Sequence, residues 1–403
     1  MDVTFISALM KIKTGQGEIS LAAMLGIWSV SALTSLPGLA VSPIMGQLSN
    51  IFPGATELEL QMLTSLPSLL IIPFVLLAGK LAECIGYAMV LYWGLALFLL
   101  SGVLYFFSHS IGELILVSGL LGVGAGMIIP LSTALVSRFF TGDYRSRQFG
   151  YVSAITNLTL VVATALTGYL ASLYWKLPFA VYLLPAISLL LVPAVFKENG
   201  SALVGRGKTS SCGVRRNAFM QGINVRPLVG SMLYYLLITY LVLVVTLNLP
   251  FLLEEYGYHS GVAGVLISLF FLAIMLPGFF INQIRRFLDG KYRFVSLFVI
   301  AVGLLLMLFH SMSMLVAGCV VAGLGYGVAQ PLIYDDTADA ATPERASLAM
   351  AWVMVMNYVA ILLAPFVMDA VQMLFNTKSQ QFPFAMNMIV STFFAVVYFF
   401  GRK

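Results

Sequence analysis

The chain alternates between long runs of apolar residues and short polar loops. Each apolar run is long enough to cross the ~30 Å hydrocarbon core of a bilayer as a helix. The predicted spans are residues 19–41, 57–79, 88–107, 113–136, 148–172, 178–196, 228–252, 261–282, 294–310, 314–337, 347–370 and 383–401. We therefore expect an all-α membrane protein with 12 transmembrane helices. The longest polar stretch, 197–227, separates a six-helix bundle in residues 1–196 from a second six-helix bundle in residues 228–403.

A glycine-rich string occurs twice in the chain, with its two copies 201 residues apart. The shared positions are Gly122, Gly124, Gly126 and Pro130 in the first copy and Gly323, Gly325, Gly327 and Pro331 in the second. This internal repeat predicts that the two bundles are pseudo-symmetric. A phosphate-binding loop would need a preceding strand and polar surroundings. The apolar flanks instead favour close packing of helices and a bend at the proline.

Composition and charge place the protein in the membrane and orient it there. Hydrophobic residues make up 60% of the 403 residues, charged residues make up 9%, and the mean hydropathy is +0.99. These values exclude an ordinary soluble domain. Of the 21 Lys and Arg residues, 19 fall on the side of the predicted membrane that holds both termini, so the termini and the linker are expected in the cytoplasm. The basic residues are then explained by topology and contact with the lipid bilayer, and we expect no nucleic-acid partner.

Residues that could carry chemistry are sparse. The three cysteines and three histidines are too scattered to form a metal or redox motif, so we expect no metal and no cofactor. An enzyme embedded in the membrane should place clusters of His, Asp or Cys at one membrane face. The sequence has no such cluster. Residues 1–18 contain no long apolar core before a small-residue cleavage site, so we expect the first hydrophobic segment to be an uncleaved spanning helix.

Amides and hydroxyls inside the predicted spans are the candidate contacts for a small-molecule substrate. Such groups are costly in hydrocarbon unless they face protein or a water-filled cavity. The candidates are Trp28, Ser31, Ser35, Asn157, Asn248, Gln330 and Asn357. The first three share one helix face at i, i+3 and i+7. Hydrogen bonds between helices are the alternative role for all seven. A cavity lined in this way would be neutral and would suit an uncharged or amphipathic solute.

Ionisable residues near the span ends are candidates for a gate or for ion coupling. Asp335 and Asp336 lie one helical turn beyond Pro331, and Asp369 lies near the outer end of the eleventh span. Two adjacent carboxylates at the negative end of a helix repel each other and the helix dipole. Three interpretations remain open: a solvated helix end, a gate salt bridge and a proton-carrying site. The arginines expected near this end are Arg138, Arg145, Arg147 and Arg345.

The segment Gly79–Gly86 reads GKLAECIG. It is similar to the signature of the major facilitator superfamily, in which Gly, Leu, an acidic residue and a second Gly precede basic residues. Glu83 stands at the acidic position and Gly86 at the second glycine. The family's usual Arg or Lys is replaced at Cys84, Tyr87 and Ala88. A fainter copy in the second half, residues 278–286, ends on Arg285 and Arg286.

The 12 spans, the repeat, the long central loop and the cytoplasmic termini make the whole chain resemble this superfamily. The resemblance implies a secondary transporter in which two bundles rock around a central site. It also implies that Glu83 caps a helix start and pairs with a nearby arginine when the cytoplasmic side is closed.

Two motifs of proton-coupled drug exporters in this superfamily are altered. Ser118 stands where those exporters carry an Arg, residues 163–168 keep only the final glycine of the fifth-helix motif, and residues 364–369 place a proline in the opposite half. We expect a monomer in the cytoplasmic (inner) membrane of a bacterium that exports a small amphipathic or neutral organic solute, with proton coupling as an option. The alternative is an importer or facilitator for a small neutral solute, and a membrane-embedded enzyme is a distant third.

Overall fold

A computed structural model describes most of the chain. The described residues are 11–15, 17–37, 41, 48, 51–55, 57–198, 222–258, 260–288, 290–342, 345–377 and 379–400. Of the predicted linker 197–227, residues 199–221 lie outside the described residues. The division into bundles at 1–196 and 228–403 therefore remains a prediction.

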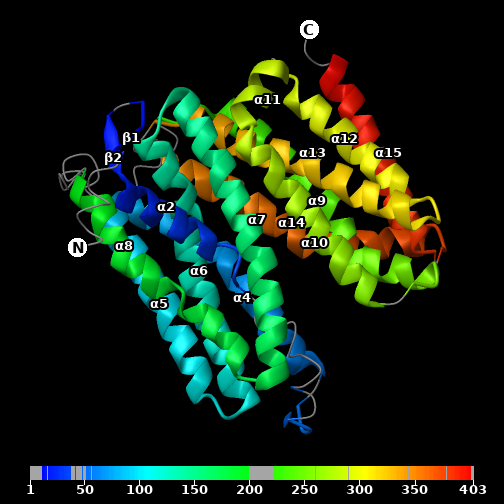
Figure 1. Ribbon diagram of the computed structural model, residues 1–403, viewed down its shortest axis with the longest axis horizontal. Coiled ribbons are helices and arrows are strands. Elements are labelled where there is room, and N and C mark those ends of the chain that lie inside the picture. Colours follow the sequence, from blue (N-terminus) through cyan, green and yellow to red (C-terminus); the bar gives the residue numbers. More distant parts are fainter. Residues whose placement is uncertain are drawn as a thin grey trace. The chain divides into compact units, whose positions relative to one another are not determined.

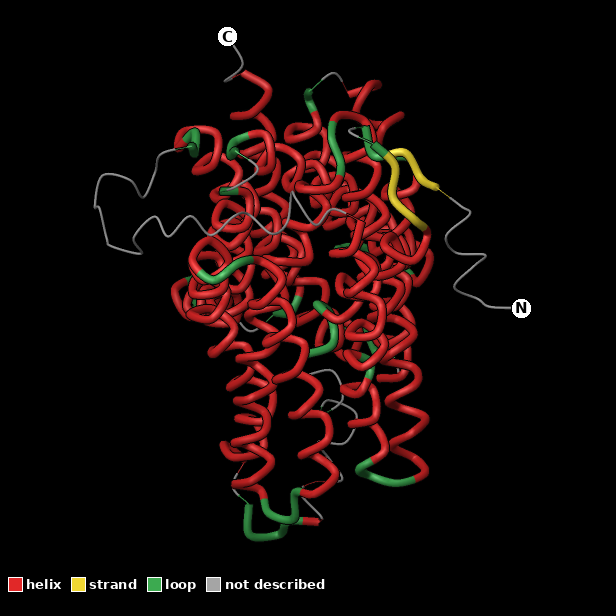
Figure 2. The backbone as a smooth tube through the Cα atoms, turned by 90° about the vertical axis from the view of Figure 1, so that its left-hand side faces the viewer, coloured by secondary structure: helices red, strands yellow, loops and turns green. Residues whose placement is uncertain are grey.

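The described chain begins with a short antiparallel hairpin. Strand β1 (Lys11–Lys13) pairs with β2 (Glu18–Ser20), and Lys11 lies opposite Ser20. Ser20 also caps helix α2 (Leu21–Leu33), because its hydroxyl accepts a hydrogen bond from the backbone N–H of Ala23. Within the described residues this hairpin is the only sheet (Figure 2).

Helices make up nearly all of the remaining described chain (Figure 1). In chain order they are α4 (Glu57–Cys84), α5 (Tyr87–Phe107), α6 (Ile111–Phe139), α7 (Gly142–Leu173), the 3-10 helix η2 (Leu177–Leu183), α8 (Pro185–Glu198), α9 (Val225–Glu255), α10 (Ser260–Phe279), α11 (Ile281–Leu288), α12 (Tyr292–Met307), α13 (Met312–Asp339), α14 (Ala346–Leu374) and α15 (Gln381–Phe400). An all-α membrane protein is therefore confirmed, and each predicted span coincides with at least one helix.

The expected count of 12 spans is not reproduced. Within the described residues, ten helices are long and apolar enough to cross a membrane, and the bent pair α11 and α12 would make an eleventh. Helix α2 has 13 residues, or about 20 Å at 1.5 Å per residue, which falls short of the hydrocarbon thickness. Its regular turns end at Thr34, three residues before Pro37, because a proline disfavours helical geometry at the residue before it.

The ninth predicted span, 294–310, corresponds to a helix that ends early, at Met307. Helix α12 has only 16 residues. The preceding α11 meets it at 105° after the turn at Gly290, whose φ is +73°. A positive φ is readily adopted only by glycine, so this residue allows the sharp turn.

The glycine repeat packs helices in the same way in both halves of the sequence. In the first copy, a Cβ added at Gly122 would lie 2.6 Å from the carbonyl oxygen of Pro67 in α4. One added at Gly124 would lie 2.7 Å from the backbone nitrogen of Phe98 in α5. No side chain fits at these distances, so the glycines allow α6 to lie directly against the backbones of two neighbours.

The second copy repeats this arrangement on α13. A Cβ added at Gly323 would lie 2.6 Å from the carbonyl oxygen of Phe270 in α10, and one at Gly325 would lie 2.8 Å from a side-chain carbon of Ile300 in α12. The packing interpretation of the glycine string therefore agrees with the structure.

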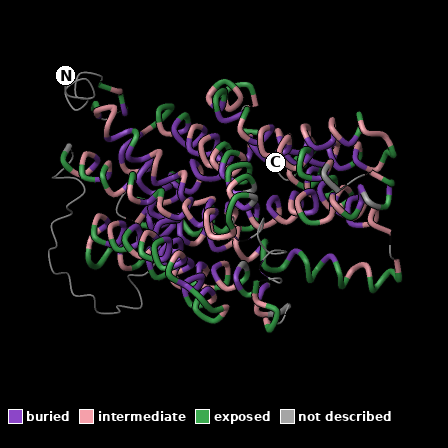
Figure 3. The backbone as a smooth tube through the Cα atoms, turned by 60° about the horizontal axis from the view of Figure 1, so that its bottom comes forward, coloured by how far each residue is buried: buried purple, intermediate pink, exposed green. Residues whose placement is uncertain are grey.

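Contacts divide the chain into two units. Unit 1 comprises Met1–Arg145, Thr159–Leu228 and Asp336–Val355, and unit 2 comprises Ser146–Leu158, Val229–Asp335 and Met356–Lys403. Each unit has its own buried aromatic core, with Tyr105 and Phe140 in unit 1 and Tyr235 and Phe384 in unit 2. Figure 3 shows buried residues recurring along one side of many helices, as expected when one face packs against neighbours and the other faces lipid.

Candidate functional site

A set of hydrogen-bonded side chains centres on Gln330 of α13, inside unit 2. The Ser153 hydroxyl on α7 donates to Gln330 Oε1 at 2.7 Å. The amide nitrogen of Gln330 donates to the hydroxyl oxygens of Tyr235 at 3.4 Å and Tyr334 at 3.2 Å. The two tyrosine hydroxyls lie 2.8 Å apart. Gln330 and Tyr334 meet because they are one helical turn apart on α13.

The set continues to α14. Thr239 lies one turn beyond Tyr235 on α9, and its hydroxyl donates to Asn357 Oδ1 at 3.2 Å. The same hydroxyl is 3.5 Å from the hydroxyl of Tyr326. We call these residues the tyrosine–amide network: Ser153, Tyr235, Thr239, Tyr326, Gln330, Tyr334 and Asn357.

The network has no formal charge, since it consists only of hydroxyl and amide side chains. Its tyrosines are nearly inaccessible, with Tyr235 only 1% exposed, whereas Gln330 and Asn357 are half-buried. The rings of Tyr235 and Phe149 pack against Tyr334, each with centroids 5.8 Å apart. Hydroxyls and amides both donate and accept hydrogen bonds. The side chains of the network can therefore exchange their hydrogen bonds to one another for hydrogen bonds to an uncharged polar group of a ligand that packs against these rings.

The predicted contacts Gln330 and Asn357 both belong to this network. Asn157 adjoins it, because its amide donates at 2.8 Å to the backbone oxygen of Ser153. The sequence pattern singles out none of the three tyrosines or Thr239. A tyrosine within an apolar run looks like packing, and its hydroxyl partner lies on another helix, so no local signal identifies it.

The other four predicted contacts are not members of this network. Trp28, Ser31 and Ser35 belong to unit 1, where Ser31 and Ser35 donate to backbone oxygens of their own segment at 3.0 and 3.1 Å. These two bonds satisfy the hydroxyls locally and differ from the bonds between helices that were the alternative role. Asn248 is half-buried on α9, about 13 Å along the helix beyond Thr239.

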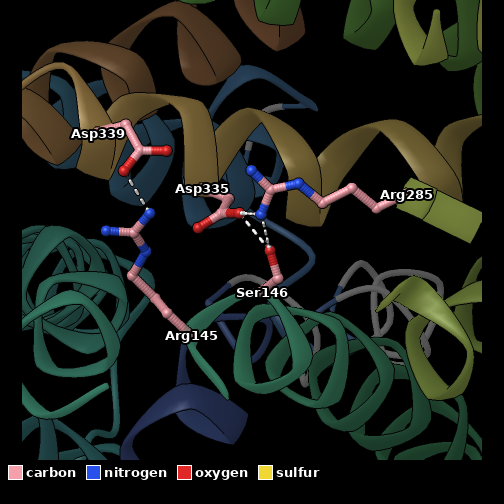
Figure 4. A network of polar contacts seen from close by, with 5 residues as sticks. All are labelled: Arg145, Ser146, Arg285, Asp335 and Asp339. Carbon is pink, nitrogen blue, oxygen red and sulfur yellow. Dashed lines mark hydrogen bonds and ion pairs between the residues drawn. The ribbon is translucent and has the colours of Figure 1, made fainter. Parts of the chain in front are cut away.

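Asp335 is buried, with only 1% of its side chain exposed, and it accepts from two donors in unit 2. These are the Ser146 hydroxyl on α7 and the Arg285 guanidinium on α11 (Figure 4). Arg285 was not among the arginines expected near this helix end. The bend between α11 and α12 is a tertiary feature, and this arginine lies on the helix just before it.

Two further ion pairs lie in unit 1, and each joins residues far apart in the sequence. Arg145 of α7 donates to Asp339 of α13 at 2.6 Å (Figure 4), and Arg345 donates to Glu83 of α4 at 2.5 Å. The Asp339 side chain is 58% exposed, whereas that of Glu83 is 21% exposed. Of the remaining predicted ionisable residues, Asp336 is half-buried and Asp369 is exposed on α14.

The segment that carries Arg345 is itself held in place. The backbone of Asn224 donates to Ala340 at 2.7 Å, and that of Thr342 donates to Gly222 at 2.9 Å, so residues before α9 pair with the turn after α13. This short ladder holds Thr342, whose carbonyl oxygen accepts a hydrogen bond from the backbone N–H of Arg345 at 2.9 Å.

Ser118 of α6 occupies the position where the resembled exporters carry an arginine. Its hydroxyl lies 2.7 Å from the hydroxyl of Tyr105 and donates to the backbone oxygen of Leu114 at 2.8 Å. Ser118 is fully buried, so this environment is neutral and satisfied. No group of His, Cys, Asp or Glu in the described part of the chain could hold a metal ion.

Several known proteins are similar to this chain. Multidrug transporter protein MdtP of Bacillus subtilis (strain 168) is 30% identical over 176 residues, which is 43% of this chain and 30% of that protein. Quinolone resistance protein NorA of Staphylococcus aureus (strain Mu50 / ATCC 700699) is 28% identical over 145 residues, covering 35% of this chain and 36% of NorA. The matched part of the chain thus spans about a third of each of these relatives.

Similarity to solved structures extends over nearly the whole chain. The human organic anion transporter MFSD10 (TETRAN) superposes with a TM-score of 0.66 at 19% identity, covering 93% of this chain and 97% of that chain. The proton:xylose symporter XylE superposes with a TM-score of 0.72 at 13% identity, covering 94% of both chains. These two structures share the fold. A family model described as Major Facilitator Superfamily matches residues 19–365 and 228–403, and the chain, a multi-pass integral membrane protein, therefore belongs to the major facilitator superfamily.

Proposed function

We propose that the protein is a secondary transporter that exports a small uncharged or amphipathic organic compound by alternating access. The observation that carries this proposal is the tyrosine–amide network, which four helices build in unit 2 without any charged side chain. The family consists of transporters, and nothing in the network resembles a catalytic arrangement.

The chemistry of the network limits the substrate. A phosphate or carboxylate in this neutral setting would be desolvated without a cationic partner, which is unfavourable. A compound with an aromatic or aliphatic body and one or two hydroxyl, carbonyl or amide groups would instead bond Gln330 and Asn357. The aromatic or aliphatic body of the compound would pack against the tyrosine and phenylalanine rings beside these amides. Export is favoured because one similar protein is named a multidrug transporter and another a quinolone resistance protein.

The ion pairs support a gate on the cytoplasmic side. Glu83 and Arg145 come from the predicted N-terminal bundle, and their partners Arg345 and Asp339 come from the C-terminal half of the sequence. Partly exposed pairs of this kind each contribute about 0.2–1 kcal/mol. Such a gate would hold a closed conformer and still open readily in each cycle.

The gate role also extends to Asp335, whose carboxylate accepts from Arg285 and Ser146. Both donors favour a charged gate residue over a solvated helix end. We propose further that the protein is a monomer in a bacterial cytoplasmic membrane, with both termini in the cytoplasm, and that protons are its coupling ion.

A second function, import or facilitated passage of a small neutral solute, is favoured by one observation. Ser118 is bonded to Tyr105 where the resembled exporters carry an arginine, so the cationic group of their coupling route is missing. This function predicts net uptake of the solute down its gradient.

Ligand binding to variants of the network tests the proposal. We expect Gln330→Ala to weaken binding of a stabilising amphipathic compound by about tenfold, since one or two hydrogen bonds are lost. The matched control is Gln372→Ala, because Gln372 donates to Ser379 near the far end of α14, away from the network. A thermal-stability screen of purified protein identifies the compound and gives both affinities. An equal loss of affinity in Gln330→Ala and Gln372→Ala would show that the network is not the binding site.

A further inference from the structure

A small cavity in unit 2 is not used by the proposed transport cycle. It has a volume of about 150 Å³ and is lined by Arg147 of α7, Phe279 at the end of α10, and Asn282 and Gln283 of α11. This volume is well above the roughly 10–15 Å³ that a single water requires. One cation, two amides and one aromatic ring therefore converge on a space that can hold a polar group.

The cation is held in a fixed position. Arg147 Nε donates to the Tyr151 hydroxyl at 2.7 Å, and its guanidinium lies 5.4 Å from the centre of the Tyr151 ring. Tyr151 in turn packs against Phe279, with ring centroids 6.2 Å apart. Within the described residues this is the only hydrogen bond of Arg147, so its two terminal amino groups remain available. They form the fork that recognises a phosphate or carboxylate.

The surroundings of the cavity are those of a membrane surface. The apolar span of α10 ends at Phe279, and the next helix, α11, turns across the axis of α12 by 105° (Figure 1). Helix α11 is strongly amphipathic, with Arg286 exposed near its end. Phe280 is 59% exposed and Phe287 is 88% exposed. A short helix with exposed aromatic and basic residues after a span is typical of one lying in the headgroup region.

We propose that this cavity binds the phosphate of an anionic phospholipid such as phosphatidylglycerol. The single negative charge of the phosphodiester matches the single guanidinium of Arg147, and the headgroup hydroxyls match the amides of Asn282 and Gln283. A free phosphate would share this chemistry, but it would make no use of the exposed Phe280 and Phe287, which acyl chains would cover. The phospholipid is therefore the proposed occupant of the cavity. Binding there would tie α7 to α10 and α11.

The test compares lipids on the purified full-length protein in neutral detergent. Phosphatidylglycerol is expected to raise the melting temperature in a saturable way, whereas phosphatidylcholine and soluble glycerol phosphate at equal concentration have little effect. In Arg147→Gln the apparent affinity for phosphatidylglycerol should fall about tenfold, because a charge-assisted contact is lost. The matched control Arg226→Gln removes an exposed arginine outside the cavity and should behave like the unmodified protein.

A second variant keeps the test decisive if Arg147→Gln does not fold. Gln283 is exposed, so Gln283→Glu should fold normally and place a negative charge beside the phosphate. It too should lose the response to phosphatidylglycerol. Unchanged affinity in Gln283→Glu, or equal stabilisation by both phospholipids, would overturn the proposal. Equal protection by soluble glycerol phosphate would show a site for soluble anions and would overturn the lipid assignment.

Discussion

Replacing Asp335 by Asn should weaken the proposed cytoplasmic gate. The substitution removes the charge that pairs with Arg285 and keeps a side chain of nearly the same size. Breaking a fully buried ion pair costs about 3–5 kcal/mol. The Arg285 side chain is 41% exposed, so water replaces part of the lost interaction. We expect a cost of roughly 1–2 kcal/mol, which raises the ratio of open to closed conformers about 5- to 30-fold.

Alkylation of a cysteine placed at Ser153 would report this opening, because Ser153 is only 2% exposed. The native cysteines Cys84 and Cys212 are first replaced by Ser, while Cys319 is fully buried and can stay. In membranes with the cytoplasmic face outward, the rate of labelling by an impermeant maleimide measures the open population.

Asp335→Asn should speed labelling about 5- to 30-fold. It should retain transport driven by a pH gradient. Asp335→Glu should label slowly, and so should the control Asp369→Asn, which removes an exposed carboxylate on α14. Unchanged labelling in Asp335→Asn would refute the gate role. Loss of pH-gradient-driven transport, with gradient-free exchange retained, would instead assign Asp335 as the proton site.

Four further substitutions, one of them a control, test other parts of the account. Glu83→Gln should favour the inward-open conformer by up to about fivefold, as inter-bundle distances from spin labels would report, since a partly exposed pair contributes up to ~1 kcal/mol. Gly150→Ala should destabilise the protein by about 1–3 kcal/mol in thermal unfolding, because the added Cβ would meet the backbone of Gly278. Gly264→Ala, on an open face of α10, should be nearly neutral. Lys176→Met should lower the unfolding temperature, because the Lys176 ammonium group donates hydrogen bonds to two backbone oxygens at the end of α5 and these bonds would be lost.

Much of the fold can be predicted from the sequence, because a membrane span is recognised by a continuous run of apolar residues. The glycine repeat is similarly visible, and Gly122 and Gly323 meet equivalent neighbours in the two halves. The exceptions are the first and ninth spans. In the first span, hydropathy continues across Pro37, whereas helix α2 ends at Leu33. In the ninth, the apolar run continues to residue 310, whereas helix α12 ends at Met307.

The candidate site is less visible in the sequence than the spans. An amide such as Gln330 stands out in an apolar run because burying it is costly. The hydroxyls of Tyr235 and Tyr334 do not stand out, because a tyrosine is also an ordinary packing residue. Likewise, several arginines could pair with Asp335, and only the turn before α12 selects Arg285. Partners set by tertiary contacts leave no periodic signal.

The central claim, export of an uncharged or amphipathic compound, is tested most directly by the direction of transport in cells. Cells that produce the protein should accumulate less of a labelled amphipathic compound than cells that produce the Gln330→Ala variant at equal abundance. An uncoupler should abolish that difference if protons drive export. Higher accumulation in cells with the unmodified protein, insensitive to the uncoupler, would contradict export and would establish an importer or facilitator.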